Sequence, residues 1–348
     1  METKVIGCVA DPLAGTELGA EIIRNGGLVA FPTETVYGLG ANGLDGDAVN
    51  RIFLAKGRPN DNPLILHVSR KEQAGNLWLE VPPEAEKLMD TFWPGPLTLI
   101  FRRAECVPDE VTAGLDTVAV RMPHNPTALA LIEKAGVPVA APSANLSGKP
   151  SPTRAEHVLR DMEGKIPLIL DGGPCRFGVE STVLSLVGIP TILRPGAVTK
   201  EMLGAVIGEV QLADCLLHPL KAGEKVLSPG MKYRHYAPKA QVYVVTGEPE
   251  KAARRILERY AAMEAQGKTV EIAGTEQTMA LYKAKGCRCS LMGDRQDPVT
   301  LCARLFTLLR EMDERAEVIL CEGVPPQGAG LAYMNRLLRA AGFQVEEV

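Results

Sequence analysis

Short runs of the chain combine cationic, hydroxyl and amide side chains at spacings suited to holding a phosphorylated ligand. The run Lys56-Gly57-Arg58-Pro59 follows a helix predicted over residues 45–56. Once glycine and proline end that helix, both cations can face one site, where arginine holds phosphate oxygens through two N–H groups and lysine acts as a point charge. The simpler alternative is that these basic residues complement the C-terminus of the helix.

A second run, residues 141–148, offers the Ser143 hydroxyl and the Asn145 amide directly after an apolar strand predicted over 137–141. In open α/β sheets, ligands bind beyond the carboxyl ends of the strands. Ser147 and Ser151 add further hydroxyl groups. Capping and turn formation explain these residue types nearly as well, and that alternative stays open.

Polar side chains also stand at the ends of several other strand-like runs. One such residue would carry little meaning, but their repetition predicts a polar cavity that binds something small and anionic. The residues are Thr33, Glu34, Thr35, His67, Arg121, Ser181 and Arg194.

Two familiar nucleotide motifs are not supported. Residues 38–43 satisfy the dinucleotide pattern G-x-G-x-x-G, but residues 32–37 separate them from the preceding strand, and no acid ends the next one. We therefore expect these glycines to form a turn. The run Gly148-Lys149-Pro150 lacks the glycine spacing of a phosphate-binding loop. No histidine pair has the spacing of metal ligands, so we expect no metal held by fixed protein ligands.

The elements that must position these residues form two differently patterned regions. Residues 15–199 alternate short strands with helices, which is typical of an α/β or α+β sheet. Residues 200–240 contain a helix near 200–207 and then prolines, glycines and a polar run at 232–236, typical of a linker or a functional lid. From residue 241, strands and helices alternate regularly, which predicts a small doubly wound, mostly parallel sheet. We expect domains over 1–205 and 241–348, joined by a linker or lid over 206–240.

Composition limits the classes of function. The chain has 348 residues, 46% of them hydrophobic, and a net charge of −4. These values are typical of a globular protein and disfavour one that holds nucleic acid by a broad cationic surface. No run is long and apolar enough for a membrane helix, and the four residues before Val5-Ile6-Gly7-Cys8 provide no secretory signal. We expect a cytoplasmic protein.

Taken together, these motifs resemble the YrdC-domain family, and the whole chain resembles its two-domain threonylcarbamoyl-adenylate synthases. The segment 228–238 is the most diagnostic and points to the longer, two-domain type. The resemblance lies in residues 32–39, 56–58, 62–64, 121–123, 142–145, 180–183, 194–196 and 228–238. It implies a YrdC-like twisted mixed sheet with helices, followed by a smaller Rossmann-like domain.

The resemblance implies that L-threonine, bicarbonate or CO2, and ATP become threonylcarbamoyl-AMP and pyrophosphate. A separate transferase complex then modifies tRNA with this intermediate, while weak RNA binding by the chain itself is left open. Lys56 and Arg58 are the implied catalytic residues, Mg²⁺ comes with ATP, and 228–238 is a candidate lid. The implied threonine-binding residues are Thr35, His67, Arg121, Ala141 and Ser181. The implied ATP-binding residues are Arg58, Asn62, Thr117, Ser143, Asn145, Ser151, Arg194 and Tyr236.

Two alternatives belong to other classes. An RNA-binding module with a basic cleft would bind RNA with a steep salt dependence and without threonine, but the acidic overall balance disfavours it. Carbamoyl transfer, as in the related domain of hydrogenase-maturation proteins, would require an acylphosphatase-like domain or zinc-finger cysteines. Neither pattern is visible in the sequence.

Overall fold

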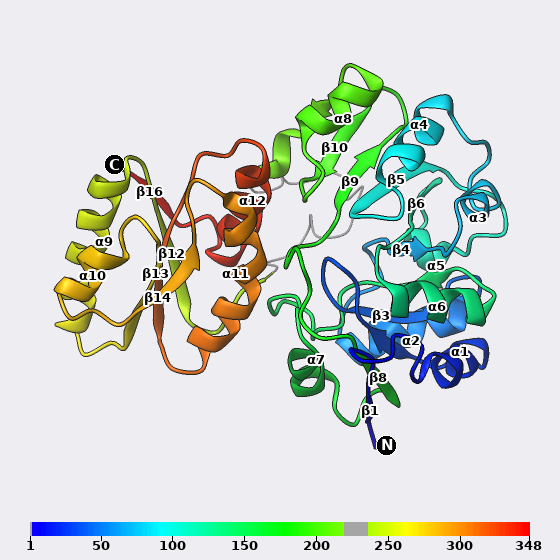
Figure 1. Ribbon diagram of the computed structural model, residues 1–348, viewed down its shortest axis with the longest axis horizontal. Helices are drawn as coiled ribbons and strands as arrows, with labels where there is room; N and C mark the ends of the chain where they lie inside the picture. Colours follow the sequence, from blue (N-terminus) through cyan, green and yellow to red (C-terminus); the bar gives the residue numbers. More distant parts are fainter. Residues whose placement is uncertain (1, 219–235) are drawn as a thin grey trace. The chain divides into compact units, whose positions relative to one another are not determined.

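A computed structural model describes residues 2–218 and 236–348 of the chain. Within this part, the chain divides into two compact units (Figure 1). The first contains residues 2–147 and 151–216, and the second contains 148–150, 217–218 and 236–348. Residues 228–235 of the expected lid lie outside the described residues, so the lid stays a prediction, as do the expected domain boundaries.

The strands of the first unit form one mixed sheet. They are β1 (Lys4–Gly7), β2 (Val29–Phe31), β3 (Gly38–Asn42), β4 (Ile65–His67), β5 (Leu97–Arg102), β6 (Thr117–Arg121), β7 (Val139–Ala140), β8 (Leu168–Asp171), β9 (Thr182–Ser185), β10 (Thr191–Arg194) and β11 (Gln211–Leu212). Among the described residues the sheet has 11 strands in the order β1-β8-β2-β3-β7-β4-β6-β5-β9-β10-β11. Parallel and antiparallel neighbours both occur, which confirms the expected mixed sheet.

Helices cover both faces of this sheet. They are α1 (Thr16–Arg24), α2 (Gly46–Lys56), α3 (Glu72–Gly75), α4 (Pro83–Phe92), α5 (Asp109–Thr112), α6 (Pro126–Ala135), α7 (Ala155–Met162) and α8 (Lys200–Ile207), with a short 3-10 helix at Asp214–Leu216. Because successive strand residues face opposite sides, Val29 and Phe31 join the core packed by α1 and α6, whereas Ala30 joins the larger core packed by α2, α4 and α7.

The glycine run at residues 38–43 corrects an expectation. It does not form the predicted turn, because Gly38–Asn42 is strand β3, paired antiparallel to β2 and β7. A Cβ atom on Gly40 would lie 2.7 Å from Val139 Cγ1 and 2.8 Å from Phe31 Cε1. Glycine at position 40 therefore allows the side chains of the two neighbouring strands to cover β3 closely.

The second unit has a regular alternation of strands and helices, as the sequence predicts. Its elements are β12 (Gln241–Thr246), α9 (Pro249–Glu264), β13 (Val270–Thr275), α10 (Met279–Ala284), β14 (Cys289–Gly293), α11 (Pro298–Asp313), β15 (Val318–Glu322), α12 (Ala329–Ala340) and β16 (Val345–Glu347). The sheet order is β14-β13-β15-β12-β16, and every pair is parallel. Figure 1 shows α9 and α10 on one face and α11 and α12 on the other.

Across the described residues of both units, no helix is both long enough and apolar enough to span a bilayer.

Candidate active site

Three neighbouring strands of the first unit bring predicted threonine-side residues together. His67 at the end of β4 stands opposite Arg121 at the end of β6, in parallel register. Paired residues on adjacent strands project to the same face of a sheet. The segment after β7 joins them, because the backbone N–H of Ala141 donates to Ile65 O at 3.0 Å. His67, Arg121 and Ala141, which the sequence places at the ends of separate strands, thus lie on or next to neighbouring strands of the sheet.

The guanidinium of Arg121 is buried and held from three sides. Its Nη2 lies 2.7 Å from Glu34 Oε1, in an ion pair whose side chains are 4% and 5% exposed. Nη1 donates to Thr35 Oγ1 at 3.0 Å, and Nε donates to Gly95 O at 3.2 Å. Among the described residues, Nη2 has no hydrogen-bond acceptor in suitable geometry despite its closeness to Glu34. The arginine is therefore fixed in orientation yet keeps hydrogen-bonding capacity.

His67 contributes no charge to this site at neutral pH. Burial, followed by the positive charge of Arg121, lowers the pKa of His67 to about 3. Its Nδ1 lies 3.2 Å from Ile65 O, and its ring meets Phe31 edge-on at 6.1 Å between centroids. The positive potential at this end of the sheet therefore comes from the arginines.

Arg194 and Ser181 form a second buried contact at the sheet. Arg194 Nε donates to Ser181 O at 3.1 Å, and Arg194 Nη2 donates to Ser181 Oγ at the same distance. Ser181 Oγ is also 2.8 Å from Thr98 Oγ1 on β5. The following turn needs glycine at Gly196, because a Cβ there would lie 2.3 Å from Thr182 N.

Lys56 ties the end of α2 to the run after β7. The lysine is 3% exposed, and its ammonium group donates to the carbonyl of Ser143 and, at 2.6 Å, to that of Asn145. Ser143 Oγ in turn donates to Asn145 Oδ1 at 2.6 Å. Gly57 ends α2 with a φ of +58°, in the left-handed region that favours glycine. The two sequence runs singled out first are thus one cluster.

Asn62 carries a buried amide with unused hydrogen-bonding capacity. Arg58 Nη2 donates to the backbone oxygen of Asn62 at 3.0 Å, and the same guanidinium lies 5.7 Å from the centroid of the Phe53 ring. The side chain of Asn62 is fully buried, and neither of its polar atoms has a hydrogen-bond partner among the described residues. A buried polar group without a hydrogen bond lowers the stability of the fold by about 1–3 kcal/mol. This indicates that a bound ligand supplies the hydrogen bonds that Asn62 lacks.

Three other residues predicted for ATP, Ser151, Thr117 and Tyr236, take no part in the contacts described so far. Ser151 donates to the buried carboxylate of Glu180 at 2.5 Å. Thr117 begins β6, four residues before Arg121, and pairs with Arg102; the strand rise puts the two ends of β6 about 13 Å apart. Tyr236 belongs to the second unit, where α11 and α12 contact it.

Three residues that support these contacts have no assigned role in the sequence-based prediction, although Glu34 is among the polar residues predicted for the cavity. Glu180 directly precedes Ser181, so an acid beside a predicted site residue was the available signal. Thr98 has no sequence signal, because a threonine inside an apolar strand is ordinary.

The balance of charge favours an anionic ligand. Among the contacts just described are four cations, Lys56, Arg58, Arg121 and Arg194, and two carboxylates, Glu34 and Glu180. Except for the half-buried Arg58, all are buried. In a desolvated setting this excess of positive charge attracts anions strongly. The arrangement can hold carboxylate and phosphate groups.

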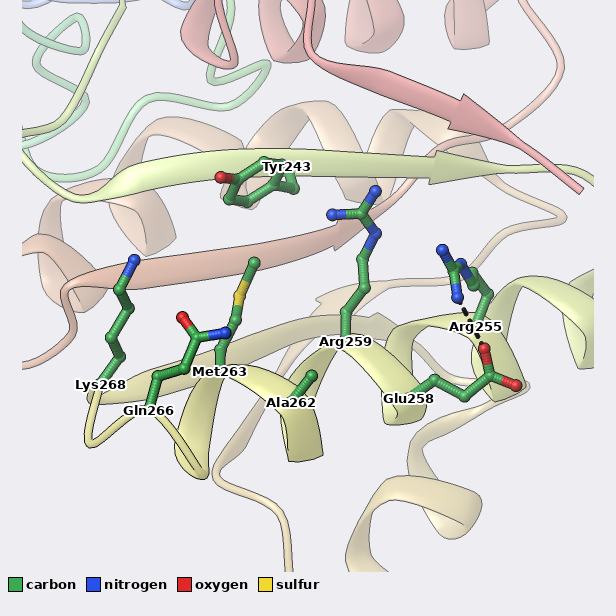
Figure 2. A pocket seen from close by; sticks show the side chains of 8 residues that line it. All are labelled: Tyr243, Arg255, Glu258, Arg259, Ala262, Met263, Gln266 and Lys268. Atoms are coloured by element: carbon green, nitrogen blue, oxygen red, sulfur yellow. Dashed lines mark hydrogen bonds and ion pairs between the residues drawn. The ribbon is translucent and has the colours of Figure 1, made fainter.

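A pocket of about 320 Å³ on the second unit contains none of the predicted site residues (Figure 2). Arg255 and Arg259 point toward it from α9, as does Tyr243 from β12. Both arginines already pair with Glu346, at 2.7 Å and 2.6 Å respectively. The positive charge of these two arginines is therefore already paired.

Comparison with known proteins covers nearly the whole chain. Residues 21–196 match the family model Sua5_yciO_yrdC, described as telomere recombination, and residues 198–342 match a model described as the threonylcarbamoyl-AMP synthase C-terminal domain. The threonylcarbamoyl-AMP synthase of Pyrococcus abyssi is 51% identical over 336 residues, covering 95% of this chain and 95% of that protein. The synthase of Bacillus subtilis is 49% identical, covering 94% and 92%.

The fold agrees with a solved structure over the same length. The crystal structure of P. abyssi Sua5 complexed with L-threonine has a TM-score of 0.91 and 47% identity to this chain. It covers 99% of this chain and 100% of that one. Both units therefore have counterparts in one solved protein.

Proposed function

This chain belongs to the Sua5/YrdC family of threonylcarbamoyl-AMP synthases, and on that premise we propose how its residues hold the substrates. The chain is an adenylyl-transferring enzyme. It forms threonylcarbamoyl-AMP and pyrophosphate from L-threonine, bicarbonate or CO2, and ATP. The amine nitrogen of threonine adds to the carbon of CO2 and loses a proton. An oxygen of the resulting carbamate attacks the α-phosphorus, whose bond to the bridging oxygen breaks as pyrophosphate leaves.

Threonine binds beside Arg121 in this proposal. The observation that carries it is the buried guanidinium held on Glu34 and Thr35, whose Nη2 lacks a hydrogen-bond acceptor among the described residues. A substrate carboxylate supplies that acceptor. The neutral ring of His67 lies on the neighbouring strand, with Ala141 and Ser181 as the remaining threonine-side residues. Because Glu34 and Thr35 hold the arginine in advance, little rearrangement is needed on binding.

ATP binds on the side of Lys56, Arg58 and Arg194. Reaction at the α-phosphorus needs in-line placement and stabilisation of charge rather than covalent help from the protein. The buried amide of Asn62 then finds partners on the nucleotide. The other residues proposed for the nucleotide are Thr117, Ser143, Asn145, Ser151 and Tyr236.

Mg²⁺ is proposed to arrive on ATP. Among the described residues no three potential ligands gather into a metal site, but the buried carboxylate of Glu180 lies beside Ser151, which is proposed for ATP. One or two carboxylates together with phosphate oxygens are a usual Mg²⁺ environment, so this residue fits a metal delivered by the nucleotide. When bound, the ion neutralises charge on the phosphate oxygens.

The product is a mixed anhydride that water hydrolyses readily, so the reaction benefits from a closed site. We propose that residues 228–238 provide the closure. We further propose that the product passes, in the cytoplasm, to a separate transferase complex that modifies tRNA.

Mass spectrometry of the small-molecule product tests the function directly. The full chain is incubated with Mg²⁺, ATP, threonine and bicarbonate, and each substrate is omitted in turn. We expect threonylcarbamoyl-AMP and pyrophosphate only when all three substrates are present. Pyrophosphate release without threonine or without bicarbonate would contradict the proposal.

Two variants test the phosphate-side residues. Arg58→Ala and Lys56→Ala should each lower the rate roughly 100-fold, the usual loss for removing one charge-stabilising donor. Lys71→Met is the matched control, because Lys71 pairs with Asp90 at the surface, 2.8 Å away. Wild-type turnover in both active-site variants would refute their role.

A further inference from the structure

The ring of Tyr236 is held between two helices of the second unit. It stacks on Phe306 of α11, with ring centroids 5.0 Å apart and an interplanar angle of 29°. The guanidinium of Arg336 on α12 lies 5.9 Å from the centroid of the same ring. Tyr236 is only 6% exposed. Stacked aromatic pairs and cation–π contacts each hold a ring in a defined orientation.

The backbone near Tyr236 is equally constrained. Its φ of +64° lies in the left-handed region, which is uncommon for a residue with a bulky side chain. The next residue, Ala237, donates its N–H to Gly148 O at 2.9 Å. Such a conformation persists where surrounding contacts determine it. Phe306 and Arg336 provide those contacts from the side of the ring.

The helix that carries Phe306 also contacts the segment 148–150. Arg310 of α11 donates to Pro150 O from Nε at 3.1 Å and from Nη2 at 2.5 Å. Residues 148–150 belong to the second unit and stand in sequence between Asn145 and Ser151. Arg310 and Arg336 are 9% and 0% exposed. Both the contact with Pro150 and the contact with the Tyr236 ring are therefore made by buried cations.

We propose that Phe306 and Arg336 are positioning residues of the synthase reaction, which act by orienting Tyr236 for the nucleotide. The proposal rests on the proposed nucleotide role of Tyr236 and gives the second unit a part in that role. Neither residue needs to touch a substrate. Phe306 restricts one face of the ring, while the cation of Arg336 fixes its orientation.

A double-mutant cycle on the full chain tests this role. Initial rates of pyrophosphate release are measured for wild type, Phe306→Leu, Tyr236→Ala and the double variant, with the concentrations of ATP and threonine varied separately. We expect Phe306→Leu to raise the KM for ATP roughly three- to tenfold, the factor that one aromatic contact supplies. The KM for threonine should stay unchanged. In the Tyr236→Ala background, Phe306→Leu should have no further effect.

A matched control separates positioning from general loss of stability. Ile256→Ala removes buried volume from α9, which packs on the opposite face of the same sheet. It should lower the thermal midpoint at least as much as Phe306→Leu while leaving the KM for ATP unchanged. Phe306→Met, which keeps the volume without the ring, repeats the test if the leucine variant folds poorly. Arg336→Lys, which keeps the charge but not the planar group, should raise the KM for ATP less than Arg336→Met.

Two results would overturn the proposal. One is an equal effect of Phe306→Leu with and without Tyr236, or the same effect from Ile256→Ala. The other is a Tyr236→Ala variant with the wild-type KM for ATP, which would remove the group being positioned. In the second case threonylcarbamoyl-AMP would still form in the wild type, so failure of the positioning role is distinguishable from failure of the proposed function.

Discussion

Buried carboxylates in the two units have opposite surroundings. In the second unit, Glu322 at the end of β15 accepts hydrogen bonds from Thr275 Oγ1 at 2.9 Å, from Tyr282 OH at 2.6 Å and from Thr278 Oγ1. In the first unit, Glu34 lies against Arg121, but neither of its carboxylate oxygens has a hydrogen-bond donor in suitable geometry among the described residues. Both side chains are buried.

The difference separates a structural network from a binding site. A fully satisfied polar cluster rigidifies its surroundings and leaves nothing for a ligand. The side chains of Glu34, Asn62 and Arg121 retain hydrogen-bonding capacity, which costs free energy unless a substrate uses it. Residues near strand ends in the two sheets can therefore be of similar type and still have different roles. Whether their polar atoms are already hydrogen-bonded distinguishes the two cases.

The largest expected effect comes from breaking the ion pair of the first unit. Arg121→Met leaves Glu34 buried without its cation, which typically costs 3–5 kcal/mol. We expect the free energy of unfolding to fall by about that amount and product formation to be lost. Chemical denaturation and mass spectrometry measure the two effects. Adding Glu34→Gln should restore most of the stability without restoring the product; recovery of product would contradict the threonine-side role of Arg121.

A smaller effect is expected from the corresponding change in the second unit. Glu322→Gln alters a network in which three hydroxyl groups donate to the carboxylate and Arg295 Nη1 lies 3.8 Å from it. We expect a loss of about 1–3 kcal/mol in the free energy of unfolding. The KM values for ATP and threonine should stay at wild-type levels in the folded fraction. A selective change in either KM would show that this network is also coupled to a substrate.

The smallest effect on stability, but a clear one on binding, is expected at Asn62. Asn62→Leu replaces an unsatisfied amide by an apolar group of similar size, so the free energy of unfolding should change by less than about 1 kcal/mol or rise. ATP at 100 times its Kd should stabilise the wild type by about 2.7 kcal/mol, and the variant much less at the same concentration. Differential scanning fluorimetry with and without ATP measures this. Equal stabilisation by ATP would mean that the nucleotide does not use Asn62.

Local patterns predict the second unit better than the first. There, each strand continues into a helix that packs on the same sheet, so periodicity and turn residues predict the elements from 241 to 341, although the short edge strand β16 is missed. In the first unit, the helices predicted over 45–56 and near 200–207 correspond to α2 and α8 to within one residue. Strand β1 is missed because it is a mostly exposed edge strand, whose partner β8 lies some 160 residues away in the chain.

Residue type and position relative to strands determined which groups this chain offers for chemistry. Thr35, His67, Arg121, Ser181 and Arg194 stand out in the amino-acid sequence as polar residues that follow or end apolar, strand-like runs. The amino-acid sequence does not determine their protonation, their hydrogen bonds or which of them come together. His67 is neutral because distant segments bury it beside Arg121, and Lys56 reaches the carbonyls of residues nearly ninety positions later in the chain. Burial and pairing depend on contacts between remote segments, so only the tertiary structure decided them.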